Sequence, residues 1–170
     1  MSGLVYAMTG ERNTHNAIAT NIVGALYVRL RGKPCRPFDS DTKIRIRLIT
    51  HVRFYYPDAP VVSRANPQTD SFQDELAVIF EVLSRQTRRI DEEEKKDAYL
   101  TIPSLAVYVL IEQDAAAIVA FRRTESGFVR EVHEGLNIVL TLAEIGIDLP
   151  LAEIYETVEF TPEPDEHEVD

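Results

Sequence analysis

The segment that most constrains the fold of this chain is a nearly continuous apolar run from Leu76 to Leu83, which contains one charged residue, Glu81. Consecutive apolar positions are typical of a strand covered on both faces, whereas a half-exposed strand alternates apolar and polar residues. Burial of a lone carboxylate costs several kcal/mol unless a cation neutralises it. The run therefore predicts a central strand in which Glu81 either forms a buried salt bridge, for instance to Arg85 or Arg88, or helps to bind a cation.

A second carboxylate, Asp58, follows Pro57 at the end of a β-branched and aromatic run. Proline fixes φ and lacks an N–H, which suits an interrupted or bulged strand, and an isolated Pro-Asp pair is most often a turn. Two carboxylates on neighbouring strands can, however, share one divalent metal ion. We therefore consider Asp58 and Glu81 together as candidate metal ligands.

Lys95 lies in the charged run that follows, where the default expectation is an exposed helix face with Asp91 paired to Lys95. A lysine beside two metal-binding carboxylates has a second use, because it balances the negative charge of the nucleophile that such a metal creates. Together Asp58, Glu81 and Lys95 predict a metal-dependent phosphodiesterase.

The remaining segments predict the order helix, strands, helix, strands, which is typical of an α/β or α+β domain with a mixed central sheet flanked by helices. The expected helices are 15–30, 88–99 and 149–155. The expected strands are 43–49, a strand at 52–56 that resumes at 61–62 after an interruption, 76–83, a hairpin of 106–111 with 115–121, and a further antiparallel pair of 128–133 with 138–142.

The length of 170 residues predicts one domain, which we place at residues 1–160, followed by an acidic and disordered tail at 161–170. The single cysteine, Cys35, excludes an internal disulfide framework and fits a reducing compartment. No apolar stretch approaches the roughly 20 residues needed to span a bilayer, and no signal peptide is evident. We therefore expect a cytoplasmic protein that does not enter a membrane.

Charge is distributed unevenly. The net charge of −10 argues against nonspecific binding to nucleic acid, which depends on clustered cations. Basic residues nevertheless gather in one stretch in which Asp39 and Asp41 are the acids: Arg29, Arg31, Lys33, Arg36, Lys43, Arg45, Arg47 and Arg53. This basic stretch leaves a nucleic-acid partner open.

Few other residues suggest chemistry. His15 lies near an expected helix start and is either a surface residue or part of a site, and Asp41 precedes a strand, where aspartate is usually a turn former. The chain has no glycine-rich phosphate loop, no nucleophile elbow and no Cys/His cluster. Hydrolysis through a protein nucleophile therefore has no support.

An ordered set of short motifs extends along the chain to about Phe160 and resembles the Uma-two family, a family of unknown function that is assigned to the PD-(D/E)XK restriction-endonuclease superfamily. The matching motifs are Val5-Tyr6-Ala7-Met8, His15-Asn16, Ser40-Asp41, Tyr56-Pro57-Asp58, Glu81-Val82-Leu83-Ser84, Asp91-x-x-x-Lys95-x-x-x-Tyr99, Ile102-Pro103-Ser104-Leu105, Tyr108-Val109-Leu110 and Leu149-Pro150-Leu151-Ala152-Glu153-Ile154-Tyr155.

The resemblance implies a restriction-endonuclease-like core with its active centre where the central strands diverge. By the same resemblance, Asp58 and Glu81 match the two acids of the motif, and Leu83 stands where the superfamily pattern has lysine. Lys95 then matches a displaced lysine supplied from the following helix. His15 and Asp41 match recurrent polar positions of the family and are expected in or beside the site.

The chain departs from the family pattern in two places. The family usually has an additional helix and an acidic segment before the match to Val5, and here only Met1-Ser2-Gly3 precedes it. Val107 stands where an acidic residue is common. We therefore expect a missing leader and an incomplete site.

Two functions of different classes remain as hypotheses. The first is a Mg²⁺- or Mn²⁺-dependent endonuclease, acting on DNA rather than RNA, with Asp58, Glu81 and the Val82 carbonyl as ligands. In it, His15 and Lys95 complete the catalytic set, and Arg45, Arg47 and Arg53 contact phosphates. The second is a catalytically inactive, nuclease-derived binding or assembly module that forms a homodimer through exposed strands.

Overall fold

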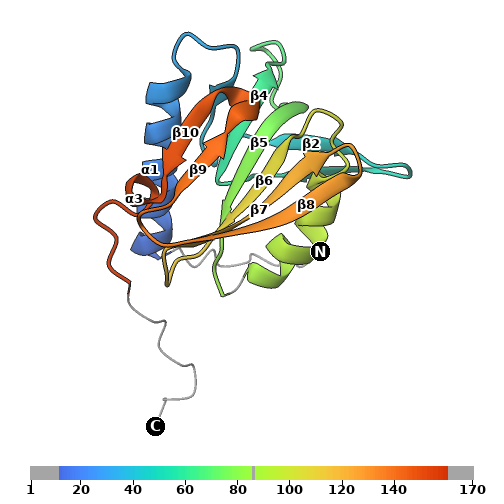
Figure 1. The fold of residues 1–170 in the computed structure, drawn as a ribbon. Coiled ribbons are helices and arrows are strands. Elements are labelled where there is room, and N and C mark those ends of the chain that lie inside the picture. The colour runs from blue at the N-terminus through green and yellow to red at the C-terminus, as the bar shows by residue number, and fades with distance from the viewer. Residues whose placement is uncertain (1–11, 86, 161–170) are drawn as a thin grey trace, which may run out of the picture.

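The computed structural model describes residues 12–85 and 87–160, and it has a six-stranded mixed sheet at its centre (Figure 1). The strands lie in the order β1-β4-β5-β6-β7-β8, with β5 and β6 parallel and every other neighbouring pair antiparallel. Their bounds are β1 (Arg36–Pro37), β4 (Ala59–Arg64), β5 (Glu75–Val82), β6 (Val107–Ile111), β7 (Ala117–Thr124) and β8 (Gly127–Glu134). The predicted mixed α+β class is confirmed.

Strand β5 is buried on both faces, as its apolar run predicts. Phe80 and Val82 face one hydrophobic cluster, and Ile79 faces the other. All three side chains are at most 1% exposed. Burial on both faces explains why hydrophobic residues occupy consecutive positions of this strand, and it makes Glu81 an exceptional residue.

One face of the sheet is covered by α1 (Asn13–Leu30), α3 (Leu151–Ile154), the short 3₁₀ helix η2 (Ala143–Ile145) and a hairpin of β9 (Val139–Leu142) with β10 (Ile147–Pro150) (Figure 1). In α1, Ile18, Ile22 and Leu26 recur at every fourth position and are completely buried. This helical period places α1 against the sheet and positions His15 near its first turn.

The other face carries the β2 (Ile44–Arg47) and β3 (Val52–Tyr55) hairpin, the π-helix η1 (Ile90–Lys95) and helix α2 (Lys96–Tyr99). Ile44 and Ile46 are buried here, while the alternating cationic residues of β2 point away. The expected helix at 88–99 is therefore present but contains a π segment, a local feature that is frequent at functional sites.

Two predicted pairings are wrong. Residues 52–62 do not form one interrupted strand, because β3 pairs with β2 in a separate hairpin and β4 joins the central sheet. Strand β8 pairs with β7, and β9 pairs with β10. Leu140 and Leu142 of β9 are completely buried in the cluster that covers the sheet face, so β9 lies over the sheet and does not extend its edge.

Across residues 12–85 and 87–160, no helix has both the length and the apolar character needed to cross a membrane. The expected acidic tail at 161–170 and the start of the chain, where a leader is expected to be missing, lie outside the described residues.

Candidate active site

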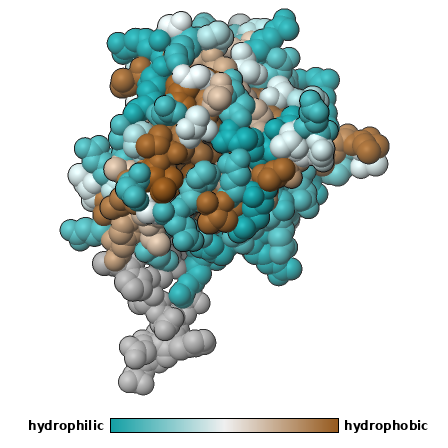
Figure 2. Space-filling model, in the orientation of Figure 1, coloured by the Kyte–Doolittle hydropathy of each residue, from teal (hydrophilic) through white to brown (hydrophobic). Residues whose placement is uncertain are grey.

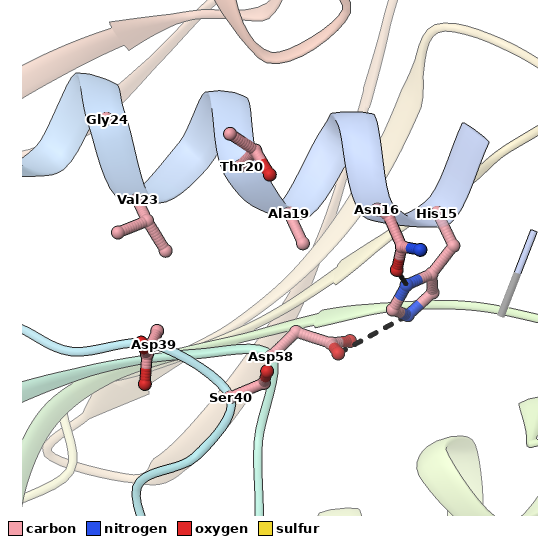
Figure 3. A pocket seen from close by; sticks show the side chains of 9 residues that line it. All are labelled: His15, Asn16, Ala19, Thr20, Val23, Gly24, Asp39, Ser40 and Asp58. Carbon is pink, nitrogen blue, oxygen red and sulfur yellow. Dashed lines mark hydrogen bonds and ion pairs between the residues drawn. The ribbon is translucent and has the colours of Figure 1, made fainter. Parts of the chain in front are cut away.

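Asp58 stands at the start of β4 and its carboxylate touches two other elements. Oδ2 accepts a hydrogen bond of 2.7 Å from the Val82 N–H of β5, and Oδ1 lies 3.3 Å from His15 Nε2 of α1. Figure 3 shows the His15 ring pointing from α1 toward this carboxylate. The Asp58 side chain is 14% exposed, so the contacts form in a mostly enclosed place. The predicted site residues Asp58 and His15 are therefore in direct contact.

Pro57 explains why this carboxylate is needed. Continuing the register of Ala59 with Phe80 outward would place Pro57 opposite Val82. The main-chain groups of Val82 face β4, because those of the adjacent Leu83 face β6, where its N–H bonds to Ile111. Proline has no N–H to donate to the Val82 carbonyl. The ladder thus ends at Pro57, Asp58 satisfies the Val82 N–H, and the Val82 carbonyl is directed toward the same opening.

Glu81 lies in a different environment. Its side chain is 4% exposed, and Oε1 is 3.4 Å from the Tyr99 hydroxyl and 3.9 Å from Lys95 Nζ. The Tyr99 hydroxyl donates to the carboxylate, and the Lys95 ammonium offsets its charge. Lys95 is thus a partly buried partner of Glu81, 20% exposed, and does not lie on a fully exposed helix face.

Aromatic rings hold this side of the site in place. Tyr99 is completely buried and lies 5.4 Å, centroid to centroid, from both Tyr55 and Tyr108. Lys95 Nζ lies 5.9 Å from the centroid of Tyr55. The sequence motifs predict no role for Tyr99, although its position four residues after Lys95 places both side chains on one helix face.

The two carboxylates come from neighbouring strands, as predicted, but they contact different layers. Asp58 lies beside α1, whereas Glu81 contacts η1 and α2, and Val82 connects them along β5. Among the described residues, no group of three or more His, Cys, Asp or Glu side chains is arranged to hold a metal ion. A cation at this place would therefore take its ligands from the two carboxylates and the Val82 carbonyl.

A cavity of about 470 Å³ opens between α1 and the chain before β4 (Figure 3). It is lined by His15, Asn16, Ala19, Thr20, Val23, Gly24, Asp39, Ser40 and Asp58. The predicted residue Asp41 is exposed and does not line this cavity; its backbone N–H bonds to Asp39. Asp39 and Ser40, which precede it, face the opening instead.

The three arginines predicted to bind nucleic acid differ from one another. Arg45 donates two hydrogen bonds of 2.8 Å to Asp74, which lowers the pKa of that carboxyl. Arg53 binds Glu94 and lies on the inner face of the β2–β3 hairpin, opposite Ile46 in the register. Arg47 alone of the three is exposed on the outer face.

Comparison with protein families identifies the chain. Residues 1–152 match the Uma2 family, described as "Putative restriction endonuclease". The chain belongs to the Uma2 family. This confirms the resemblance seen in the sequence.

Two individual proteins are similar to the chain. An uncharacterized protein of Synechocystis is 28% identical over 116 residues, which cover 66% of this chain and 64% of that protein. A crystal structure of a protein from Anabaena variabilis, described as "a putative nuclease belonging to DUF820", has a TM-score of 0.69 at 15% identity and covers 85% of this chain and 81% of its own. At this identity the structural match supports the fold.

Proposed function

We propose that this Uma2 protein is a Mg²⁺- or Mn²⁺-dependent endonuclease that hydrolyses phosphodiester bonds, preferentially in DNA. The observation that carries the proposal is the end of the β4–β5 ladder. There Pro57 withholds the main-chain donor of the Val82 carbonyl, the Asp58 carboxylate accepts the Val82 N–H, and the adjacent Glu81 carboxylate lies toward η1 and α2. Oxygen donors of this kind suit a hard divalent cation.

The residues fit such a cation in chemistry. Asp58, Glu81 and the Val82 carbonyl would hold it, and the remaining positions of an octahedral ion would be taken by water and substrate. When bound, the ion supplies a Lewis acid that acidifies water and neutralises negative charge on the scissile phosphate.

The surrounding side chains have separate roles in this proposal. Lys95 holds a positive charge 3.9 Å from Glu81 and would stabilise the charge that develops on the phosphate. His15, 3.3 Å from Asp58, would orient that carboxylate and exchange protons with the substrate side of the cavity. Tyr99 donates a hydrogen bond to Glu81. It acts as a positioning residue, because its hydroxyl contacts the proposed metal ligand Glu81.

The outer face of the β2–β3 hairpin is the surface best suited to the nucleic-acid backbone. Lys43, Arg45 and Arg47 alternate on it with the exposed rings and aliphatic groups of the opposite strand, and Lys43 Nζ lies 5.2 Å from the Phe54 ring centroid. Phe54 is 48% exposed and Tyr56 is 55% exposed. Cations interleaved with exposed aromatic rings suit phosphates and unstacked bases.

Cleavage of supercoiled and single-stranded DNA in the presence of Mg²⁺ or Mn²⁺ tests the proposal. Asp58→Asn and Glu81→Gln should each lower the rate by about a hundredfold or more, because each removes a charged ligand while keeping its shape. Glu75→Gln, at the exposed opposite end of β5, is the matched control and should cleave like the unmodified protein. Equal rates for Asp58→Asn, Glu81→Gln and the unmodified protein would contradict the assignment.

One observation favours the alternative of a catalytically inactive binding module. Lys95 and Tyr99 already balance the charge of Glu81 without a metal ion. A purely structural buried ion pair has the same arrangement. Calorimetric titration with Mg²⁺ and Mn²⁺ separates the two. An endonuclease requires binding at millimolar concentration or below that is lost in Asp58→Asn, whereas no binding of either ion supports the inactive module.

A further inference from the structure

Strand β8 forms an open edge of the central sheet. It is the last strand in the sheet order (Figure 1). Among residues 12–85 and 87–160 it pairs with β7 alone, over a continuous register from Thr124 with Gly127 to Ala117 with Glu134. Natural edge strands are usually interrupted by proline or a bulge, or are covered by another element. Strand β8 has no proline and its register has no bulge.

Two hydrogen bonds establish which main-chain groups of β8 face outward. The Arg123 N–H bonds to Ala106 of the preceding strand connection at 2.8 Å, so odd-numbered residues of β7 face β6 and even-numbered residues face β8. The Gly135 N–H bonds to Ala116 at 2.8 Å, which continues the same alternation. The N–H and C=O groups of the even-numbered β8 residues therefore point away from the sheet: Phe128, Arg130, Val132 and Glu134.

We propose that this edge pairs with β8 of a second copy of this chain, antiparallel and with Val132 on the two-fold axis. In this register, Val132 faces Val132 of the second copy, Arg130 faces Glu134, and Glu131 faces His133. The outward main-chain groups of Arg130, Val132 and Glu134 then exchange hydrogen bonds across the axis. The two central sheets become one continuous sheet.

Charge selects this register from its neighbours. In antiparallel pairing, a residue whose main-chain groups face outward lies opposite another such residue. The alternative registers are therefore those that keep even-numbered residues of β8 opposite even-numbered residues of the second copy. One such shift places Arg130 opposite Arg130 of the second copy, and another places Glu131 opposite Glu131. Like charges directly opposite are destabilising. The Val132 register is the one that places Arg130 opposite Glu134 without placing like charges directly opposite one another.

The charged groups are available for this pairing. Within the described part of the chain, neither Arg130 nor Glu134 makes an ion pair of its own. Glu131 already bonds to Arg122 at 2.9 Å and to His133 at 3.2 Å, so its contact with the second copy would extend an existing network.

Apolar side chains support the same arrangement. Val132 is 49% exposed and Leu136, just beyond the strand, is 50% exposed. Figure 2 shows the face that carries β8 as mainly hydrophilic with separate hydrophobic groups. Such a surface suits association through main-chain and charge pairing, with small apolar contacts between.

Sedimentation velocity over a concentration series tests the proposal, since it separates a 19.3 kDa monomer from a dimer of twice that mass. We expect the unmodified chain to form a dimer. Arg130→Glu and Glu134→Arg should each raise the dimer dissociation constant about tenfold or more, because each creates two symmetric like-charge pairs. The combined variant Arg130→Glu with Glu134→Arg restores both pairs and should return the constant to within about threefold of the unmodified value.

Two further variants complete the design. Glu125→Arg makes the same charge change in the β7–β8 turn, away from the paired edge, and should leave the dissociation constant unchanged. Val132→Pro removes an outward N–H without breaking the bonds to β7, and it should abolish the dimer while circular dichroism remains that of the folded chain. A monomeric unmodified chain overturns the proposal, and so does a dimer that Val132→Pro leaves intact or that the combined variant fails to restore.

Discussion

Asp58 and Glu81 are neighbours across β4 and β5, yet the structure treats their charges differently. Asp58 uses its carboxylate to complete a main-chain ladder that Pro57 interrupts, beside an open cavity and His15. Glu81 is buried, with a lysine and a tyrosine hydroxyl as its partners. At position 58 the fold needs an oxygen atom that accepts the Val82 N–H. Glu81 instead needs a positive charge nearby.

The difference teaches how one candidate site can combine two requirements. A residue whose fold role is to accept a hydrogen bond can lose its charge with little effect on stability, whereas a buried charge cannot lose its counter-ion cheaply. Substitutions that remove a charge but keep the shape of the side chain should therefore change the free energy of unfolding differently on the Asp58 side and on the Glu81 side.

The largest effect on stability is expected at the Glu81 side. Lys95→Met leaves a buried carboxylate without its cation and should lower the free energy of unfolding by about 3 kcal/mol at pH 7. Urea unfolding measures this. The double variant Lys95→Met with Glu81→Gln removes both charges and should recover most of the loss. If the double variant is no more stable than Lys95→Met alone, the two side chains do not act as a pair.

At the Asp58 side we expect a smaller loss that depends on hydrogen bonding and not on charge. Asp58→Ala leaves the Val82 N–H without its acceptor and should cost about 1–3 kcal/mol in the same urea experiment. Asp58→Asn keeps an acceptor oxygen and serves as the control, with a loss below about half of that value. Equal losses for the two variants would mean that charge, not the ladder end, makes Asp58 important for stability.

Tyr99→Phe sharpens the comparison further. It removes one hydroxyl from the Glu81 side and should lower the free energy of unfolding by about 1 kcal/mol. Because Tyr99 positions Glu81, we also expect the Mn²⁺ affinity measured by calorimetry to fall. Tyr55→Phe serves as control, because its ring lies in the same stack while its hydroxyl contacts Arg53 and Glu94. An unchanged affinity in Tyr99→Phe would reduce Tyr99 to a packing role.

The smallest effect concerns pH and the hairpin that packs on the Glu81 side. Hydrogen bonds from Arg45 lower the pKa of Asp74 in the folded protein. A depressed folded-state pKa stabilises the protein above the unfolded-state value of about 4, and the contribution is lost as pH falls through the folded-state pKa. Asp74→Asn should therefore lower the melting temperature slightly at pH 7, and the two melting curves should converge below about pH 4. A difference that persists at lower pH would point to packing.

Much of the site followed from local sequence. Apolar consecutive positions predicted β5 as a central strand with Glu81 as its anomaly. Pro57-Asp58 predicted an interruption, but the segments on either side of it are two strands of different sheets. Lys95 was predicted because a lysine can balance charge beside two metal-binding carboxylates, although a lysine within a charged run is ordinarily exposed. The contact of Tyr99 with Glu81 was not predicted. The i, i+4 spacing of Lys95 and Tyr99 places both side chains on one helix face, but the sequence does not show that this face lies against a buried carboxylate.

What the sequence alone determined is therefore the burial of the main elements and the β6–β7 hairpin, because hydrophobic periodicity reports how many sides of a segment are covered and a short turn joins adjacent strands. Tertiary structure alone decided the pairing of the other strands, which layer each carboxylate contacts, and which arginines are already occupied. Strands 128–133 and 138–142 have similar local patterns, yet β9 covers the sheet face and β8 is left as its edge. The reason is physical: strand pairing and ion pairing depend on groups far apart in the chain, whose proximity no local pattern encodes.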